Sequence, residues 1–168
     1  MNNPSEKPGV KFDKIDLKIL KILQENAKIT NLQLSAEIGL SPAPTLERVK
    51  KLENAKLIKS YHAALDEEAL GIGIKAFIQV SLTRQINNAI HNFKQQIMEI
   101  DEIIECYQVT GTADYQLKLM VKDIAAFEQL IEEKLSKIEE IGQMQTMVIL
   151  STVKDTKLIP LDYEREKQ

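Results

Sequence analysis

The feature of the sequence that most constrains its fold is the stretch TNLQLSAEIGLSPAPTLERVKKLEN, residues 30–54. Thr30, with a glutamine three residues later, has the pattern of a capping box, which begins a helix. Gly39 stands where this helix must end, because glycine adopts positive φ without a steric clash. Ser41, followed by a proline suited to a first helical turn, is expected to cap a second helix through its hydroxyl. The stretch therefore predicts two helices joined by a tight turn.

The second of these helices has an apolar side and a charged side. A helical wheel places three aliphatic residues on one face: Leu46, Val49 and Leu52. The opposite face carries charged residues: Glu47, Arg48 and Lys51, with Lys50 at its margin. A helix inserted in the major groove of DNA needs an apolar back and a cationic front. An ordinary helical hairpin with a solvated face has the same pattern, but the two helix starts, the glycine and the basic front together favour DNA binding.

The expected DNA contacts follow from this helix and the segment after it. Arg48 and Lys51 are expected to contact DNA from the exposed side, and residues near the N-terminus of the helix to lie near phosphates. The following segment, AKLIKSYHAALD, alternates in part and predicts one or two short strands, a β wing. Tyr61 in this wing either touches DNA or packs. The full expected set of DNA-contacting residues is Ser41, Thr45, Arg48, Lys50, Lys51 and Lys59.

A further helix is predicted before the two-helix stretch. Asp13 has the position of an N-cap, with Asp16 at the third helical position. The predicted inner face consists of four aliphatic residues: Ile15, Ile19, Ile22 and Leu23. This helix is needed to bury the backs of the next two, since a two-helix unit has too small a core to stand alone.

The charge of the chain is divided unevenly. The whole sequence has 22 Lys+Arg and 25 Asp+Glu, a net charge of −3. Residues 1–60 contain 11 and 7 of these, which gives +4, and residues 61–168 contain 11 and 18, which gives −7. The positive charge therefore belongs to the part predicted to bind DNA, and the acidic part is expected to face away from the phosphate backbone.

Composition limits where the protein acts. With 43% apolar residues the chain can bury a core, but no apolar run approaches the ~20 residues that span a membrane. The first ten residues are polar and lack the apolar core of a signal peptide. Cys106 is the single cysteine, which excludes an internal disulfide and suits a reducing compartment. A cytoplasmic protein without a membrane partner is the expectation.

The second half of the chain has a different period. Apolar alternation predicts strands at 75–82, 103–109, 115–121 and 144–153, and helical spacing predicts helices at 86–100 and 123–138. The order strand, helix, strand, strand, helix, strand is the split βαβ, ferredoxin-like (βαββαβ) arrangement, an antiparallel sheet with both helices on one face. The strands carry apolar residues on both parities, so the second face needs a cover. A second copy of the chain is the expected cover, in an obligate dimer.

These residues resemble the Lrp/AsnC (leucine-responsive, or feast/famine) transcription regulators of bacteria and archaea. The resemblance covers about residues 12–161, and three pieces carry it most strongly: FDKIDLKILKILQENAKIT, LSAEIGLSPAPTLERVKKLE and VTGTADYQLKLMV. It implies an α+β protein, with an N-terminal winged helix-turn-helix domain and a C-terminal ferredoxin-like effector-binding domain. The expected divisions are an arm at 1–11, a DNA-binding domain at 12–65, a linker at 66–73, an effector and oligomerisation domain at 74–155 and a tail at 156–168.

The resemblance also implies partners. Such proteins bind double-stranded DNA, dimerise through the sheet, often assemble into octameric discs, and bind an amino acid where dimers meet. The implied effector-binding turn comprises Gly111, Thr112, Ala113, Asp114 and Tyr115. Backbone amides after the glycine suit a carboxylate, and the aspartate suits an α-ammonium group. From spacing alone, a tight turn whose Asp stabilises its own backbone is the simpler interpretation.

Three positions depart from the family pattern. Ser35 stands where helix-turn-helix units often place alanine, a conservative change in size. An acidic residue commonly follows the glycine of the effector turn, and Thr112 stands there. A glycine often precedes the wing, where this chain has Lys56; positive φ at that lysine would cost on the order of 1 kcal/mol unless Asn54 takes the role.

Other chemistry finds little support in the sequence. His62 and His91 lack neighbours at metal-ligand spacing, and neither a phosphate-binding loop nor a nucleophile motif is present, so no metal, cofactor or catalytic residue is predicted. Two alternatives remain beside an effector-modulated regulator. One is an architectural protein that binds DNA without sequence choice, and the other is a haem-pathway decarboxylase, because some of those enzymes resemble this family.

Overall fold

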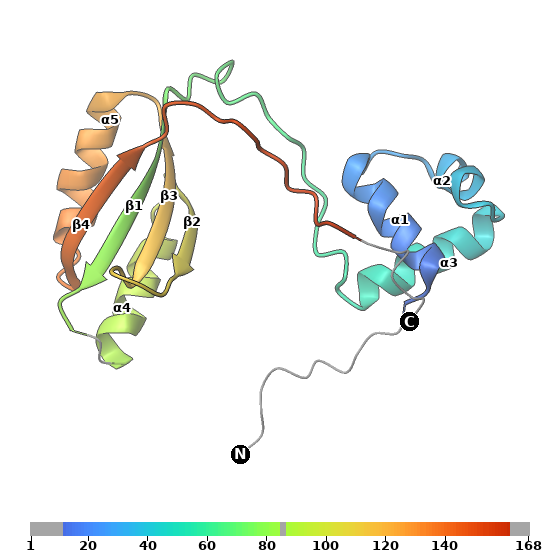
Figure 1. Ribbon diagram of the computed structural model, residues 1–168, viewed down its shortest axis with the longest axis horizontal. Coiled ribbons are helices and arrows are strands. Elements are labelled where there is room, and N and C mark those ends of the chain that lie inside the picture. The colour runs from blue at the N-terminus through green and yellow to red at the C-terminus, as the bar shows by residue number, and fades with distance from the viewer. Residues whose placement is uncertain (1–11, 85–86, 162–168) are drawn as a thin grey trace. The chain divides into compact units, whose positions relative to one another are not determined.

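The computed structural model describes residues 12–84 and 87–161 (Figure 1). The predicted arm at 1–11, Ile86 and the last seven residues lie outside this range. The chain divides into two compact units, and each is described by itself. The first contains residues up to 64 together with the segment from 155 onward, and the second contains residues 65–154.

The first unit is helical. Its helices are α1 (Lys14–Glu25), α2 (Asn31–Ile38) and α3 (Pro42–Asn54). They enclose a core of four buried aliphatic residues: Ile19, Leu34, Ile38 and Leu52. The capping boxes at Asp13 and Thr30 are both confirmed, and Gly39 ends α2 with φ +74°. Three helices around one core, with a tight turn between α2 and α3, are the predicted arrangement.

Both ends of α3 differ from the prediction in detail. Ser41 is extended at the N-cap, but its hydroxyl caps no amide in the described part of the chain, so the predicted hydroxyl cap is wrong. The Thr45 hydroxyl instead donates to the Ser41 carbonyl at 2.9 Å. After the helix, Lys56 and not Asn54 takes positive φ, at +55°. This geometry lets the Leu57 amide donate to the Leu52 carbonyl at 3.0 Å.

The predicted wing does not form strands. Residues 55–65, all described by the structure, are turns and irregular backbone. A strand needs a neighbour to accept and donate its backbone hydrogen bonds, and no strand lies in the described part of this unit. The Tyr61 side chain is 46% exposed, and its hydroxyl donates to Glu53 Oε1 at 2.9 Å. Partial burial, followed by this bond to a carboxylate, raises the pKa of Tyr61 to about 12.

The C-terminal segment returns to the helical unit. The Ile159 amide donates to Gln24 Oε1 at 2.7 Å, and Gln24 Nε2 donates to the Ile159 carbonyl at 3.2 Å. One side chain of α1 therefore satisfies both backbone groups of a residue 135 positions later. The chain crosses between the two units twice, once after residue 64 and once before residue 155.

The second unit is a four-stranded antiparallel sheet with its helices packed on one face. The elements are β1 (Ile74–Leu82), α4 (Asn87–Met98), β2 (Ile103–Gln108), β3 (Tyr115–Val121), α5 (Ile124–Gln129) and β4 (Ile141–Val148). The strand order is β2-β3-β1-β4. Alternate residues of β1 and β3 point into one core with α4 and the segment after α5. The predicted ferredoxin-like fold is confirmed.

The second helix of this unit is not regular throughout. A π-helical turn (Leu130–Lys134) and a 3₁₀ turn (Leu135–Lys137) follow α5. In an α-helix, residues five apart fall on different faces, but the wider π turn brings them together. Leu130 and Leu135 are consequently both buried against the sheet. The single regular helix predicted at 123–138 is therefore interrupted by these two turns.

Strand β4 begins and ends earlier than predicted. It pairs antiparallel with β1, and the last hydrogen bond runs from the Ile149 amide to the Lys75 carbonyl at 2.9 Å. Because β1 begins at Ile74, the chain beyond residue 149 has no partner to pair with. Leu150 and Val153, predicted to lie in the strand, are 96% and 98% exposed.

The sheet face opposite the helices is more polar than predicted. The register places Phe77 between Lys118 and Met147. Lys118 Nζ forms an ion pair with Glu105 Oε1 at 3.2 Å. In the next row along β1, all three aligned residues are glutamines: Gln79, Gln116 and Gln145. Apolar side chains on this face are therefore interleaved with amides and an ion pair.

Candidate DNA-binding and effector sites

The buried side of α3 differs from the one that the helical wheel predicts. Thr45 and Leu52 are fully buried, whereas Leu46, predicted to face inward, is 42% exposed. The prediction that Thr45 contacts a phosphate is therefore wrong in this structure, because its hydroxyl is inside and bonded to the backbone of Ser41. The helical wheel correctly predicted that α3 has a buried side and a charged side, but Thr45 lies on the buried side in place of Leu46.

Arg48 is the residue whose position differs most from the prediction. Its Nη1 forms ion pairs with Asp13 Oδ2 and Asp16 Oδ1, each at 2.7 Å. These bonds raise the pKa of Arg48. Asp13, which accepts from the Asp16 amide and from Arg48, has its carboxyl pKa held below the usual value. The Arg48 side chain lies on α1 and is 28% exposed, so it does not belong to an unpaired cationic front.

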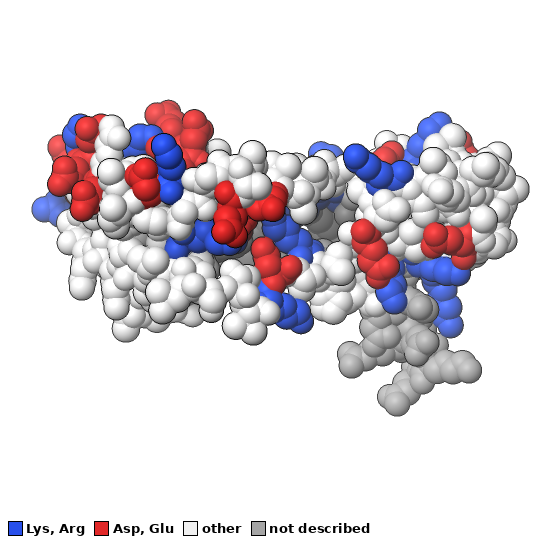
Figure 2. All heavy atoms as spheres, turned by 90° about the horizontal axis from the view of Figure 1, so that it is seen from above, with Lys and Arg blue, Asp and Glu red and all other residues white. Residues whose placement is uncertain are grey.

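The other predicted DNA contacts lie at the surface. Ser41, Lys50, Lys51 and Lys59 are all exposed. Lys50 Nζ is 3.9 Å from Glu47 Oε1, whereas Lys51 Nζ is 3.3 Å from Asp16 Oδ2. Acidic and basic side chains are interspersed over the visible face of each unit (Figure 2). On the face of the helical unit seen in Figure 2, basic side chains are therefore interspersed with acidic ones.

Two contacts that the sequence reasoning missed fix the turn between α2 and α3. Asn31 Nδ2 donates to the Pro42 carbonyl at 2.8 Å, which joins the first turn of α2 to the first turn of α3. Lys18 Nζ donates to the Glu37 carbonyl at 2.6 Å and joins α1 to the end of α2. Neither has a local sequence signal, because each joins residues on different helices.

The predicted effector turn is held by its own backbone. Gly111 has φ +123°, and the Val109 amide donates to the Asp114 carbonyl at 3.0 Å. Asp114 also reaches β1: its amide donates to the Val80 carbonyl at 2.9 Å, and its Oδ2 accepts from the Leu82 amide at 2.8 Å. The aspartate therefore supports the turn by joining it to β1.

The five predicted effector residues divide into outer and inner ones. Gly111 and Thr112 are exposed, whereas Ala113 and Tyr115 are buried. The Tyr115 ring packs on Phe93 with centroids 4.7 Å apart, and its hydroxyl has no hydrogen-bond partner among the described residues. The side available to a ligand consists of the outer two residues.

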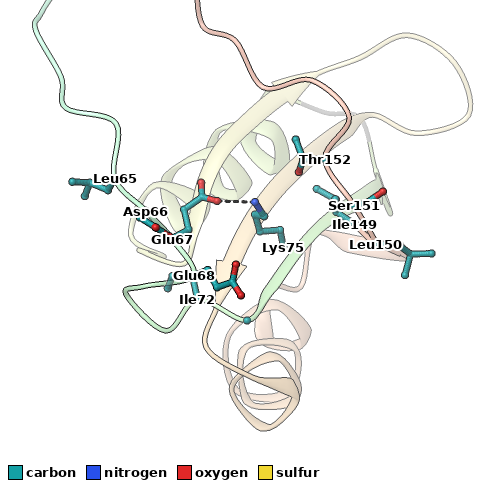
Figure 3. A pocket seen from close by; sticks show the side chains of 11 residues that line it. Leu65, Asp66, Glu67, Glu68, Ile72, Lys75, Ile149, Leu150, Ser151 and Thr152 are labelled. Atoms are coloured by element: carbon teal, nitrogen blue, oxygen red, sulfur yellow. Dashed lines mark hydrogen bonds and ion pairs between the residues drawn. The ribbon is translucent and has the colours of Figure 1, made fainter.

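A cavity of about 570 Å³ lies elsewhere in the sheet unit (Figure 3). Its walls come from residues 65–75 and 149–152, and none of the predicted effector residues lines it. Lys75 and Glu67 form an ion pair at 2.6 Å within it, so its main cation is already neutralised. The Leu65 side chain points away from this pair in Figure 3.

Within residues 12–84 and 87–161, no group of three or more His, Cys, Asp or Glu side chains is placed to hold a metal ion. No helix in this range is long and apolar enough to cross a membrane.

Comparisons with known proteins match both units. Residues 12–59 match the winged helix-turn-helix DNA-binding model, and residues 75–159 match the Lrp/AsnC ligand binding domain. The chain is 38% identical over 154 residues to the transcriptional regulator AzlB of Bacillus subtilis, covering 92% of this chain and 98% of AzlB. It is 35% identical over 156 residues to the leucine-responsive regulatory protein of Escherichia coli K12, covering 93% and 95% of the two chains.

Solved structures agree. A transcriptional regulator of Neisseria meningitidis in complex with L-Met superposes with a TM-score of 0.87 and 35% identity, covering 91% of this chain and 99% of the other. An AsnC family regulator of Agrobacterium tumefaciens gives a TM-score of 0.85 and 30% identity, covering 91% and 99%. Since the similarity runs through both units, the chain belongs to the Lrp/AsnC family of DNA-binding transcriptional regulators.

Proposed function

We propose that the protein regulates transcription by inserting α3 into the major groove of DNA, and that an amino acid bound by the sheet unit modulates this binding. The observation that carries the proposal is the way in which α3 packs: one side of the helix is buried and cationic side chains lie at the surface. Leu52 and Thr45 anchor it in the helical core, while Lys50 and Lys51 lie at the surface. Arg48 is partly exposed and is held against α1 by Asp13 and Asp16. The protein acts by binding and not by catalysis, in the cytoplasm, where the DNA is.

The proposed DNA contacts are the four exposed members of the predicted set, Ser41, Lys50, Lys51 and Lys59, together with the partly exposed Arg48. Ser41 is the exposed N-cap of α3, so its hydroxyl and the Ala43 amide can donate to a phosphate, whereas Pro42 and Pro44 in the same turn have no N–H. Lys50 and Lys59 contribute point charges toward the backbone. Thr45 supports the first turn from inside.

A matched pair of lysine substitutions tests this assignment. Lys50→Ala removes one exposed cation of α3, and Lys14→Ala removes one exposed cation at the start of α1. On DNA from upstream of the protein's own coding sequence, Lys50→Ala is expected to weaken binding by about 1–3 kcal/mol if it reads a base, or to lower the salt slope by about 1 if it contacts a phosphate. The Lys14 variant should match the wild type. Equal losses in both variants would contradict α3 as the contacting element.

The proposed effector is an amino acid at the turn of residues 111–115. The structure of the Neisseria regulator with L-Met supports an amino acid, and the exposure of Gly111 and Thr112 supports this turn. Asp114 contributes by holding the turn against β1. Thr112, where the family commonly has an acidic residue, is the position expected to set which amino acid binds.

Two threonine substitutions separate the turn from the cavity. Thr112→Lys places a bulky cation on the turn, and Thr152→Lys places one on the cavity wall. In calorimetric titrations with the twenty amino acids one at a time, the Thr112 variant should lose the binding seen for the wild type, while the Thr152 variant retains it. The reverse pattern would assign the effector to the cavity.

The proposed assembly is a homodimer through the sheet face opposite the helices. The proposed higher form is an octamer built from such dimers. Phe77 and Met147 on this face supply apolar area, and the Glu105–Lys118 pair supplies polar contacts. Such a dimer presents two α3 helices, so its DNA site should be pseudo-palindromic. Sedimentation as a monomer at micromolar concentration would contradict this arrangement.

A further inference from the structure

The carboxylate of Asp16 has an unusual position for an acidic side chain of a DNA-binding unit. It lies in the first turn of α1 and is 0% exposed. Its two oxygens have different cationic partners on α3: Oδ1 accepts from Arg48 Nη1 at 2.7 Å, and Oδ2 accepts from Lys51 Nζ at 3.3 Å. A buried carboxylate is tolerated only when paired in this way, because leaving water costs several kcal/mol.

The side chains of Asp16, Arg48 and Lys51 differ in how far they are exposed to solvent. Asp16 is fully buried, the Arg48 side chain is 28% exposed and the Lys51 side chain is 53% exposed. The carboxylate is therefore the buried member of the cluster, and it contacts both cations. Lys50, between them in the sequence, pairs with Glu47 at 3.9 Å, and both of those side chains are more than half exposed.

We propose that Asp16 is a positioning residue for sequence recognition: it fixes the Arg48 guanidinium and the Lys51 ammonium as a pair and offsets part of their charge. This inference rests on the proposal that α3 reads DNA. Affinity for any DNA comes from cations that neutralise phosphates. Discrimination comes from donors held in fixed geometry at base edges, and donors that are already ordered lose less entropy on binding. Asp16 thus lowers the affinity for DNA in general and increases the discrimination between DNA sequences.

Asp13 provides a comparison within the same cluster. Its Oδ2 accepts from Arg48 at 2.7 Å, but its side chain is 54% exposed. Its Oδ1 caps α1 by accepting from the Asp16 amide at 2.9 Å. Asparagine caps helices about as well as aspartate, so Asp13→Asn keeps the cap and removes only the charge opposite Arg48.

The test compares full-length wild type, Asp16→Asn and Asp13→Asn. A DNA sequence is first selected by the wild type from a randomised pool of duplexes of about 30 base pairs, long enough for two half-sites. Affinities for this sequence and for a shuffled version are then measured over a range of KCl, with folding checked by circular dichroism. The readouts are the ratio of the two affinities and the slope of log affinity against log salt.

For Asp16→Asn we expect the affinity ratio to fall by about tenfold or more, affinity for shuffled DNA to rise, and the salt slope to steepen by about one as Lys51 becomes available to a phosphate. Asp13→Asn, which leaves Lys51 anchored, should lower the ratio by about two- to threefold. A purely structural role would lower both affinities by the same factor and leave ratio and slope unchanged.

The outcomes test the role of Asp16 separately from the proposal that α3 reads DNA. An unchanged ratio in folded Asp16→Asn overturns the role of Asp16. If that variant does not fold, Asp13→Asn decides, and a ratio equal to that of the wild type overturns the inference. If the wild type selects no sequence from the pool, the proposal that α3 reads DNA is overturned, and this inference with it.

Discussion

Asp114 Oδ2 accepts a hydrogen bond from the Leu82 amide at 2.8 Å, which joins the turn before β3 to the end of β1. Asp114→Ala removes a charged acceptor from a partly buried amide and should lower the free energy of unfolding by about 1.5–3 kcal/mol. Urea denaturation measures this change, with Asp101→Ala at an exposed residue as control. A loss of amino-acid binding with unchanged stability would instead make Asp114 a direct ligand contact.

Leu52 and Leu46 test which side of α3 is buried. Leu52 is 0% exposed in the helical core, and Leu46 is 42% exposed. Leu52→Ala should cost about 2–5 kcal/mol of unfolding free energy, since it leaves a cavity, while Leu46→Ala should cost less than half as much. Thermal or urea unfolding distinguishes them. Similar losses would mean that α3 packs as the helical wheel predicted.

Lys56 has a left-handed backbone conformation, which is unfavourable for any residue with a Cβ atom. At φ +55°, Lys56→Gly removes the steric cost of the left-handed region, partly offset by the entropy of glycine. The net expectation is a gain of about 0.5–1 kcal/mol in unfolding free energy. Lys59→Gly in the following irregular segment serves as control and should be neutral or destabilising. Destabilisation by Lys56→Gly would show that the lysine contributes a contact worth more than its strain.

The Asp13 carboxylate gives the helical unit a pH dependence with a definite sign. Its pKa is lowered from the ordinary value of 3.8, by the Asp16 amide foremost and also by Arg48. A carboxyl with a depressed folded-state pKa stabilises the fold above its unfolded pKa, and that stabilisation is lost as pH falls through the folded value. The stability difference between wild type and Asp13→Asn should thus be constant near neutral pH and disappear below 3.8. A difference that persists at lower pH would contradict this origin.

How far the sequence predicts this structure depends on the distance over which each feature is determined. The caps at Asp13 and Thr30 and the left-handed Gly39 are confirmed because each depends on residues within a few positions. Strand order and helix placement follow from periodicity and short connections. The ion pairs of Arg48 were missed because they join residues 32 and 35 positions apart, and a helical wheel contains no information about the neighbouring helix.

The remaining errors have the same physical cause. The wing was predicted from alternation, but a strand also requires a partner, and residues 55–65 have none in the described helical unit. The predicted strand to residue 153 ends where β1 can no longer pair with it. At the effector turn, the Asp114 carboxylate accepts from the Leu82 amide of β1, 32 positions away, a contact that local spacing does not contain.

Whether this chain reads DNA sequence is measured most directly by the ratio of its affinities for the selected and the shuffled duplex. Wild-type protein is expected to enrich a defined, pseudo-palindromic sequence from a randomised pool and to bind it about a thousandfold or more tightly than the shuffled version. Addition of the bound amino acid should shift that ratio. A pool that never converges, with equal salt-dependent binding to both duplexes, would contradict the account and show an architectural DNA-binding protein.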